Sequence, residues 1–168
     1  EGASSVPRPS GDPCVATPSA VTGTTTFTDD AHVARLTIPT AFSPTQPFDG
    51  RWAEWTSGDA TLRYWVDGGN NDAAARYQEV RASLIGTPCV DVFEPPPYTD
   101  GRYIISGFQA DGTKVYERGR IRCNTLVWYR MTWRTETSHR LVAATAKLQV
   151  SDDPGLDALG GDYALCDE

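Results

Sequence analysis

Three closely spaced segments with the composition of β-strands, between residues 101 and 134, most constrain the fold of this chain. They are rich in Tyr, Ile, Val and Trp, which favour a pleated, half-buried surface. The first two are separated by Asp111-Gly112, a dipeptide typical of tight hairpins because Gly adopts positive φ without steric cost. Strands joined by such short turns are antiparallel, so this part of the chain predicts an antiparallel meander. The expected strands are residues 102–108, 113–122 and 126–134.

The remaining segments predict further strands and two helices. Residues 31–39 alternate between apolar and other side chains, as a strand with one buried face does. A Trp-rich hairpin is expected over residues 51–66. Helices are expected over residues 73–85 and 139–150, and Ser138 is the expected N-cap of the second. We therefore expect an α+β fold, in which an antiparallel sheet of about six strands is flanked by two helices.

The domain organisation follows from length and composition. The chain of 168 residues is long enough for one domain and too short for two of ordinary size. Residues 1–30 are rich in Pro, Ser and Thr and predict an extended N-terminal arm. Residues 31–150 are assigned to a single α+β domain, and residues 151–168, with six acidic and no basic residues, predict an acidic C-terminal tail. No long apolar run occurs, so we expect no direct membrane span.

The charge distribution bears on the class of partner. The formal net charge of −7 disfavours nucleic acid and anionic lipid as partners. Residues 113–140, in contrast, carry a local charge of +5. A protein with one basic side and acidic flanks can be steered onto a charged protein surface. We therefore expect a larger protein complex as the partner, and neither nucleic acid nor a small-molecule substrate.

Arginine and tryptophan in the last two strands of the meander form the candidate partner-binding surface, because both residue types are enriched in interface hot spots. Arg118, Arg120 and Arg122 alternate, so they are expected on one face of their strand. The alternative is a solvated sheet face whose Arg side chains cover Trp and Tyr rings. The candidate partner-binding residues are Arg118, Arg120, Arg122, Trp128, Arg130 and Arg134.

The turn between these two strands decides which side chains share a face. A three-residue turn at 123–125 would place Arg120 opposite Trp128 and Arg118 opposite Arg130. A two-residue turn would instead place the arginines opposite Tyr129 and Met131. The sequence leaves both registers open.

Four cysteines, Cys14, Cys89, Cys123 and Cys166, occur without the C-x-x-C spacing of a zinc knuckle or a redox pair. An even number of widely spread cysteines favours two disulfides in an oxidising compartment, and hence a periplasmic or secreted protein. Of the three possible connectivities we favour Cys14 with Cys166 and Cys89 with Cys123. Four reduced thiols are the alternative.

Signatures of catalysis and of metal binding are weak in this sequence. The two His residues lie far apart and outside any zinc or triad pattern, and no Gly-rich nucleotide-binding loop occurs. We therefore expect no catalytic residue, no cofactor and no enzymatic activity, although a hydrolase with paired carboxylates is a further hypothesis. Asp67, Asn70 and Asp72 are weak candidates for binding a hard cation such as calcium. Capping of the following helix is the simpler interpretation.

The order of motifs along the chain has a counterpart in a known family. A first strand ending in Pro is followed by a Trp-rich hairpin, a helix and an aromatic-rich meander. The motifs are Leu36-Thr37-Ile38-Pro39, Phe42-Ser43, helix 73–85, Tyr103-Ile104-Ile105-Ser106-Gly107 and Lys114-Val115-Tyr116-Glu117-Arg118. Over about residues 31–150 this order resembles the Mog1/PsbP-like family of α/β/α sandwich domains, which includes bacterial secreted members of unknown role. The sequence departs from the family at Thr135-Glu136-Thr137-Ser138, where relatives have a Tyr-Pro-Ala-like turn.

The resemblance implies a function in binding. Members of the family dock on larger assemblies, as PsbP does on the lumenal face of a photosystem, and share no catalytic residue. We therefore expect a non-enzymatic, extracytoplasmic accessory subunit of a larger complex, which could be membrane-bound or photosynthetic. The alternative is a small-ligand carrier, or a secreted binding module, with a Trp-lined pocket.

Overall fold

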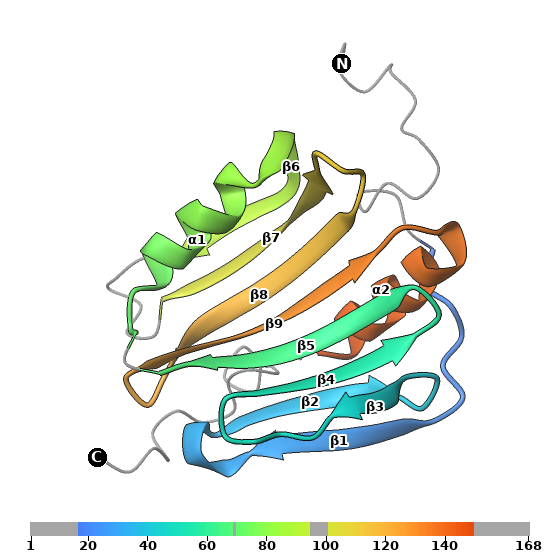
Figure 1. The fold of residues 1–168 in the computed structure, drawn as a ribbon, viewed down its shortest axis with the longest axis horizontal. Coiled ribbons are helices and arrows are strands. Elements are labelled where there is room, and N and C mark those ends of the chain that lie inside the picture. Colours follow the sequence, from blue (N-terminus) through green and yellow to red (C-terminus); the bar gives the residue numbers. More distant parts are fainter. Residues whose placement is uncertain (1–16, 69, 95–100, 150–168) are drawn as a thin grey trace.

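The computed structural model describes residues 17–68, 70–94 and 101–149. Seven antiparallel strands form one sheet in the order β3-β4-β5-β9-β8-β7-β6, and β1 pairs with β2 in a separate two-stranded sheet. Helix α1 lies on one side of the large sheet, called the front face here, and α2 lies on the other side with β1 and β2 (Figure 1). The strands are β1 (Thr24–Asp29), β2 (Ala34–Pro39), β3 (Ser43–Gln46), β4 (Trp52–Ser57), β5 (Ala60–Asp67), β6 (Leu84–Glu94), β7 (Arg102–Gln109), β8 (Lys114–Arg122) and β9 (Thr125–Trp133). The helices are η2 (Asp30–His32), α1 (Ala73–Ala82) and α2 (Glu136–Leu148).

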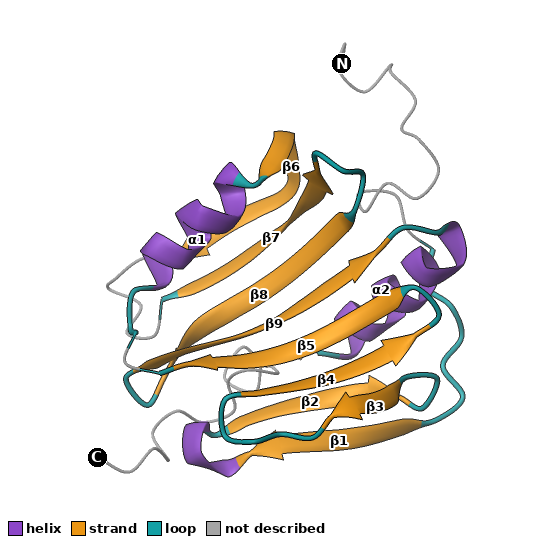
Figure 2. Cartoon of the chain, viewed as in Figure 1, coloured by secondary structure: helices purple, strands orange, loops and turns teal. Residues whose placement is uncertain are grey.

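The predicted α+β class with two longer helices and an antiparallel sheet is confirmed, but the strands are more numerous than expected (Figure 2). Strand β1 lies inside the segment expected to be an extended arm. Strand β3 lies in a segment that contains two prolines. Because Pro cannot donate a ladder hydrogen bond, such a segment can form only an edge strand, and β3 is at the edge of the large sheet. The described part of the predicted arm therefore ends in a strand.

Both helix boundaries differ from the predictions. Helix α1 ends at Ala82, because Ser83 closes it and Leu84 already begins β6. Helix α2 begins at Glu136, and its N-cap is Thr135, whose side chain accepts a hydrogen bond from the Ser138 backbone N–H. The predicted N-cap, Ser138, is therefore inside the first turn of the helix.

A two-residue turn joins β8 to β9. Cys123 and Asn124 both have positive φ, 53° and 62°, which is the conformation that a type I′ hairpin requires. Arg118 consequently lies opposite Tyr129, as the two-residue alternative predicted, but Arg120 lies opposite Val127. Met131, the other partner expected for an arginine, lies opposite Tyr116. Val127 and Tyr129 belong to the back cluster, so the arginines opposite them also point to the back of the sheet.

The large sheet is covered by a hydrophobic cluster on each side. On the back, α2 and β2 pack against β5 and β9, with Leu36, Tyr64 and Met131 fully buried. On the front, α1 packs over β6, β7 and β8, with Val80 and Ile105 in the core. Each cluster covers only part of its face, because α1 contacts β6 to β8 on the front, and α2 contacts β5 and β9 on the back. Within the described ranges, no helix is long and apolar enough to cross a bilayer.

Candidate functional site

Among the described residues, no helix lies over the front face of β4, β5 and β9, since α1 lies over the neighbouring strands β6 to β8 (Figure 1). Strand β5 shows how this face is made: every second residue from Ala60 to Val66 is buried on the back, and Thr61, Arg63 and Trp65 point to the front. The alternation of the strand thus separates an apolar back from a front of aromatic and charged side chains.

Three tryptophans form a row across these strands. Trp52 on β4 is the direct partner of Trp65 on β5, which is the partner of Trp128 on β9. The ring centroids of Trp65 and Trp128 are 5.9 Å apart at an interplanar angle of 18°, and those of Trp52 and Trp65 are 5.7 Å apart at 45°. The rings therefore lie against one another instead of lying flat on the sheet, which suits direct cross-strand pairs.

Guanidinium groups cover the faces of these rings. The Arg76 Cζ atom, from α1, is 4.2 Å from the Trp128 ring centroid, and the Arg63 Cζ atom is 5.2 Å from that of Trp52. Both lie within the range of a cation–π interaction. Arg51 lies 5.8 Å from the Trp65 ring centroid in the same way. We call this surface the Trp–Arg face; its residues are Trp52, Trp65, Trp128, Arg51, Arg63, Arg76 and Arg130.

A row of charged side chains runs parallel to the tryptophan row, two residues away along each strand. Its members are direct cross-strand partners in the order Glu54, Arg63, Arg130, Glu117. Arg63 donates to the Glu54 carboxylate from Nε at 3.1 Å and from Nη2 at 2.6 Å. The two arginines thus stand side by side at the centre of the row, and each binds a carboxylate on its outer side.

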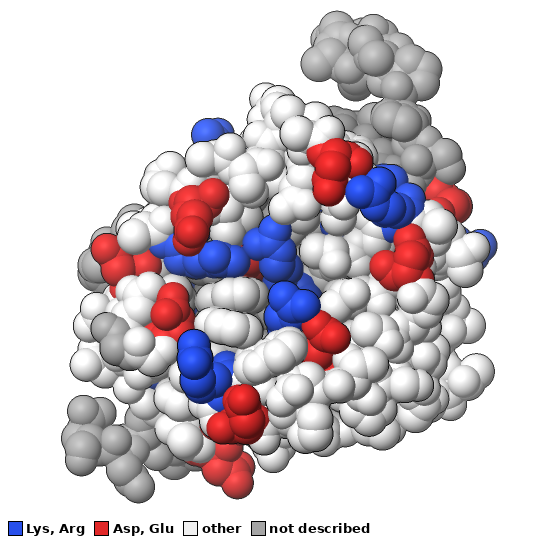
Figure 3. All heavy atoms as spheres, in the orientation of Figure 1, with Lys and Arg blue, Asp and Glu red and all other residues white. Residues whose placement is uncertain are grey.

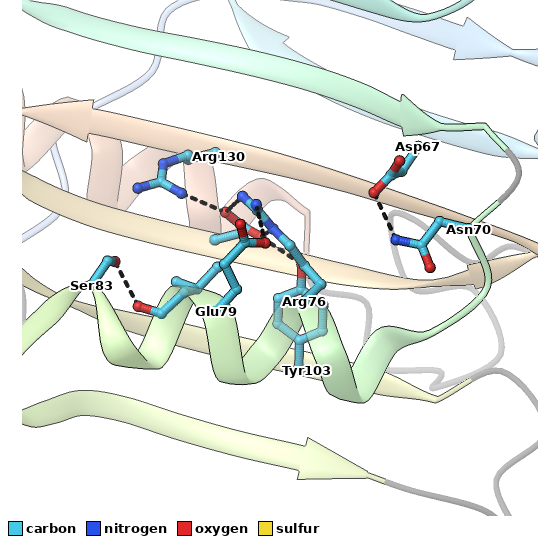
Figure 4. A network of polar contacts seen from close by, with 9 residues as sticks. Asp67, Asn70, Arg76, Glu79, Ser83, Tyr103 and Arg130 are labelled. Atoms are coloured by element: carbon cyan, nitrogen blue, oxygen red, sulfur yellow. Dashed lines mark hydrogen bonds and ion pairs between the residues drawn. The ribbon is translucent and has the colours of Figure 1, made fainter.

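Glu117 is the buried centre of this arrangement. Its side chain is fully buried and accepts two hydrogen bonds of 2.8 Å from Arg76, one of 3.0 Å from Arg130 Nη1 and one of 2.5 Å from the Tyr103 hydroxyl. Arg76 reaches this carboxylate from α1 and Arg130 reaches it from β9; both arginines are labelled in Figure 4. A buried charge is costly unless it is paired and fully hydrogen-bonded, as it is here. Glu117 therefore holds two guanidinium groups of the Trp–Arg face in place.

The ionisation states of the network follow from burial and charge. Burial, and next the negative charge of Glu117, raise the pKa of Tyr103 well above its usual value, so its hydroxyl remains a donor. Burial opposes the charged form of Arg76, but the hydrogen bonds and charge of Glu117 outweigh it and raise the pKa of Arg76. Both partners are thereby kept in the forms that bind the carboxylate.

The structure divides the predicted partner-binding residues between two faces. Trp128 and Arg130 lie on the front, in the Trp–Arg face. The three alternating arginines lie on the back and are buried, with exposed fractions of 8% for Arg118, 4% for Arg120 and 0% for Arg122. Arg134 follows β9, has a side chain 57% exposed and lies 3.4 Å from Asp111. The six residues therefore do not form a single surface patch.

The weak metal candidates have hydrogen bonds that account for their positions. Asp72 is the N-cap of α1, and its Oδ1 atom accepts the Ala75 backbone N–H at 2.9 Å. Asn70 donates from its side-chain amide to Asp67 at 2.8 Å (Figure 4). Within the described ranges, no group of three or more His, Cys, Asp or Glu residues is arranged to hold a metal ion. For Asp72, the simpler interpretation, capping of the helix, is confirmed.

The cysteine positions test one predicted pair. Cys89 and Cys123 are both disulfide-bonded, and no free cysteine occurs among the described residues. Cys89 precedes Val90, which pairs with Ser106 and through it with Tyr116 on β8. Cys123 directly follows β8 and lies seven residues beyond Tyr116, a distance of roughly 23 Å at about 3.3 Å per residue. A bond between Cys89 and Cys123 is incompatible with this separation, because bonded cysteines have Cα atoms within about 7 Å. The other predicted pair, Cys14 and Cys166, lies outside the described residues.

A pocket of about 100 Å³ on the back of β6, β7 and β8 is lined by no tryptophan. Its lining residues are Val92, Glu94, Arg102, Ile104 and Arg118. The pocket is smaller than the clefts of several hundred Å³ that hold drug-sized ligands. The tryptophans of the Trp–Arg face lie instead on the front of the sheet, away from this pocket.

Sequence reasoning missed most of the Trp–Arg face. Trp52 and Trp65 were expected in a hairpin, but not beside Trp128, and Arg63, Arg76 and Glu117 were not singled out. The alternation of β5 was a usable signal for which residues share a face. The pairing of β5 with β9 was not predictable from spacing, because these strands are far apart along the chain.

Comparison with known proteins identifies no family. No family model matches the sequence, and no curated protein matches it with significance. Among solved structures, the chain is similar to PA94, a protein of unknown function from Pseudomonas aeruginosa, at 17% sequence identity. The match covers 78% of this chain and 98% of PA94, with a TM-score of 0.40. Membership of the Mog1/PsbP-like family stays a prediction.

Proposed function

We propose that this protein is a non-enzymatic accessory subunit that acts outside the cytoplasm and docks on a larger, membrane-bound complex through the Trp–Arg face. The observation that carries the proposal is a row of three tryptophans on a sheet face over which the described residues place no helix, with guanidinium groups against the rings. Trp52 and Trp65 are half-buried on this face, and Trp128 is buried beneath Arg76. Trp and Arg are the residue types most enriched in interface hot spots. The disulfide-bonded state of Cys89 and Cys123 supports an oxidising compartment.

The rigidity of this face supports binding to a protein. The Trp128 ring lies between Trp65 and Arg76, and Arg76 is itself held by the buried Glu117. Side chains that are already ordered lose little conformational freedom on association, so more of the contact energy appears as affinity. The same stacking argues against nucleic acid or sugar ligands, because the ring faces that bases or sugars would use are already covered.

Site-specific photo-cross-linking in cells that normally make the protein tests the proposal. A photoreactive phenylalanine derivative replaces Trp52, at the edge of the Trp–Arg face, or Lys147, an exposed residue of α2 on the back layer. We expect position 52 to yield a discrete cross-linked complex and position 147 to yield none. Equal cross-linking from both positions, or none from position 52, would overturn the proposal.

A further inference from the structure

The charged row of the Trp–Arg face contains two like charges in direct opposition. Arg63 on β5 and Arg130 on β9 are Cα partners and point to the same face. Directly opposed residues have Cβ atoms about 5 Å apart, and like charges at this position destabilise a sheet unless a counter-charge lies nearby. Glu54 and Glu117 bind the two arginines from their outer sides only.

Several guanidinium donors remain after these contacts. Arg63 uses Nε and Nη2 for Glu54, and Arg130 uses Nη1 for Glu117. Among the residues that the structure describes, none accepts a hydrogen bond from Arg63 Nη1 or from Arg130 Nε and Nη2. Figure 4 shows the rest of the Arg130 guanidinium pointing away from the network around α1. The side chains are 44% and 19% exposed, so a ligand from solvent can reach them.

A third cation adjoins this pair. Arg51 is exposed, lies over the Trp65 ring, and its guanidinium forms no ion pair with a described residue. Figure 3 shows Lys and Arg gathered at the centre of this face, with Asp and Glu around them. Because screening at physiological ionic strength acts over about 8 Å, an anion bound here interacts with these arginines much more strongly than with distant acidic residues.

We propose that the space between Arg63 and Arg130 binds a carboxylate of the docking partner, and that the partner presents an acidic protein segment to the Trp–Arg face. This inference rests on the proposed function. A carboxylate between two guanidinium groups accepts charge-assisted hydrogen bonds from both and removes their mutual repulsion. Neighbouring apolar atoms of an extended segment contact the edges of Trp52 and Trp65.

Binding of short synthetic peptides to the full chain tests this inference. The probe is hexaglutamate, the uncharged control peptide is hexaglutamine, and inorganic phosphate and hexauridylate represent the other sources of anions. The variants are Arg63→Gln and Arg51→Gln, both at exposed positions, with Arg35→Gln, exposed on β2 in the back layer, as the matched control. Arg63→Gln leaves Glu117 and its partners untouched, so the fold is expected to persist, and a thermal melt checks this.

We expect hexaglutamate to bind the wild-type chain and hexaglutamine to bind at least about tenfold more weakly. Arg63→Gln is expected to weaken hexaglutamate binding about tenfold, and Arg35→Gln to leave it unchanged. Binding of phosphate with the same dependence on Arg63, but no gain from the peptide, would show a small-anion site and overturn the inference. Tighter binding of hexauridylate than of hexaglutamate would also overturn it.

The two proposals fail separately. If position 52 still forms its cross-linked complex but hexaglutamate does not bind, or binds independently of Arg63, the acidic-segment inference fails and the docking proposal stands. If position 52 forms no complex while hexaglutamate binds through Arg63, the docking proposal fails, and the carboxylate site remains as an isolated property of this face.

Discussion

The ring of Tyr103 on β7 lies directly over Gly119 on β8, its Cα partner across the sheet. A Cβ atom added at Gly119 would lie 2.6 Å from the Tyr103 hydroxyl oxygen. The absence of a side chain at this position therefore lets the Tyr103 hydroxyl reach the carboxylate of Glu117, 2.5 Å away. A glycine inside a central strand is costly in itself, and here it provides the room for a buried hydrogen bond.

Gly119→Ala is expected to destabilise the protein by about 2 kcal/mol, because the new methyl group must displace the buried Tyr103 ring. Chemical denaturation of both proteins measures the difference in free energy of unfolding. Gly68→Ala is the matched control, since no atom of a described residue lies within 4 Å of its added Cβ. Equal stability of the two variants would contradict the contact.

Glu117→Gln is expected to lower the free energy of unfolding by about 3 kcal/mol, because it leaves Arg76 and Arg130 without their buried counter-charge. Glu79→Gln also removes a carboxylate that binds Arg76, but Glu79 has a side chain 73% exposed, so we expect a loss below about 0.5 kcal/mol. Urea titrations of the two variants measure this contrast. A small effect at position 117 would show that the network is dispensable.

Asp59 in the β4–β5 turn is expected to make stability depend on pH in the acid range. Burial alone would raise the pKa of Asp59, but hydrogen bonds from Ser138, Arg134 and Thr135 outweigh it and lower the pKa. The carboxylate therefore stabilises the folded state at pH values above the unfolded-state pKa of about 3.9. This contribution is lost as pH falls through the lower folded-state pKa.

Asp59→Asn is accordingly expected to cost about 1 kcal/mol at neutral pH and progressively less as pH falls through the lowered folded-state pKa of Asp59, because the wild-type carboxylate then becomes protonated. Thermal melts across pH 2–7 measure the dependence. Asp30→Asn is the control, since Asp30 is exposed and its side chain makes no hydrogen bond to a described residue. A constant difference between wild type and the Asp59 variant at all pH values would refute the assignment.

The strand register predicts which cysteine-linked fragments peptide mapping will not find. Protease digestion of the unreduced protein is expected to yield no fragment that links Cys89 to Cys123, because their positions in the sheet are much too far apart for a bond. Alkylation without reduction is expected to label neither residue. Detection of that linked fragment would contradict the strand register.

Local sequence signals predicted the individual strands and helices better than they predicted how these elements pair and pack. The Asp111-Gly112 turn and the apolar alternation of the meander correctly predicted β7, β8 and β9. Likewise, the capping residue Asp72 marked the start of α1. The end of α1 was missed, because Leu84 and Ile85 fit an apolar helix face as well as the start of a strand. Such features depend on near neighbours in the chain, which the sequence displays directly.

Which side chains share the binding face depended on the length of the β8–β9 turn, because one residue more or less changes the strand register. The alternation of Arg118, Arg120 and Arg122 correctly placed them on one face of β8, but the turn length decided which face of β9 they joined. Because side chains alternate with a period of two, a change of one residue in that turn exchanges the front and back of every later position. The predicted surface was consequently divided between two sides.

The sequence by itself determined the fold class, the meander, the hairpin and the helix start, since these follow from side-chain periodicity and turn chemistry over a few residues. Only the tertiary structure decided that Trp65 lies beside Trp128 and that Glu117 binds Arg76, because these contacts join segments about 40 to 60 residues apart. No local pattern encodes such pairings. They depend on which strand edges and helix faces bury the most apolar surface once the whole chain has folded.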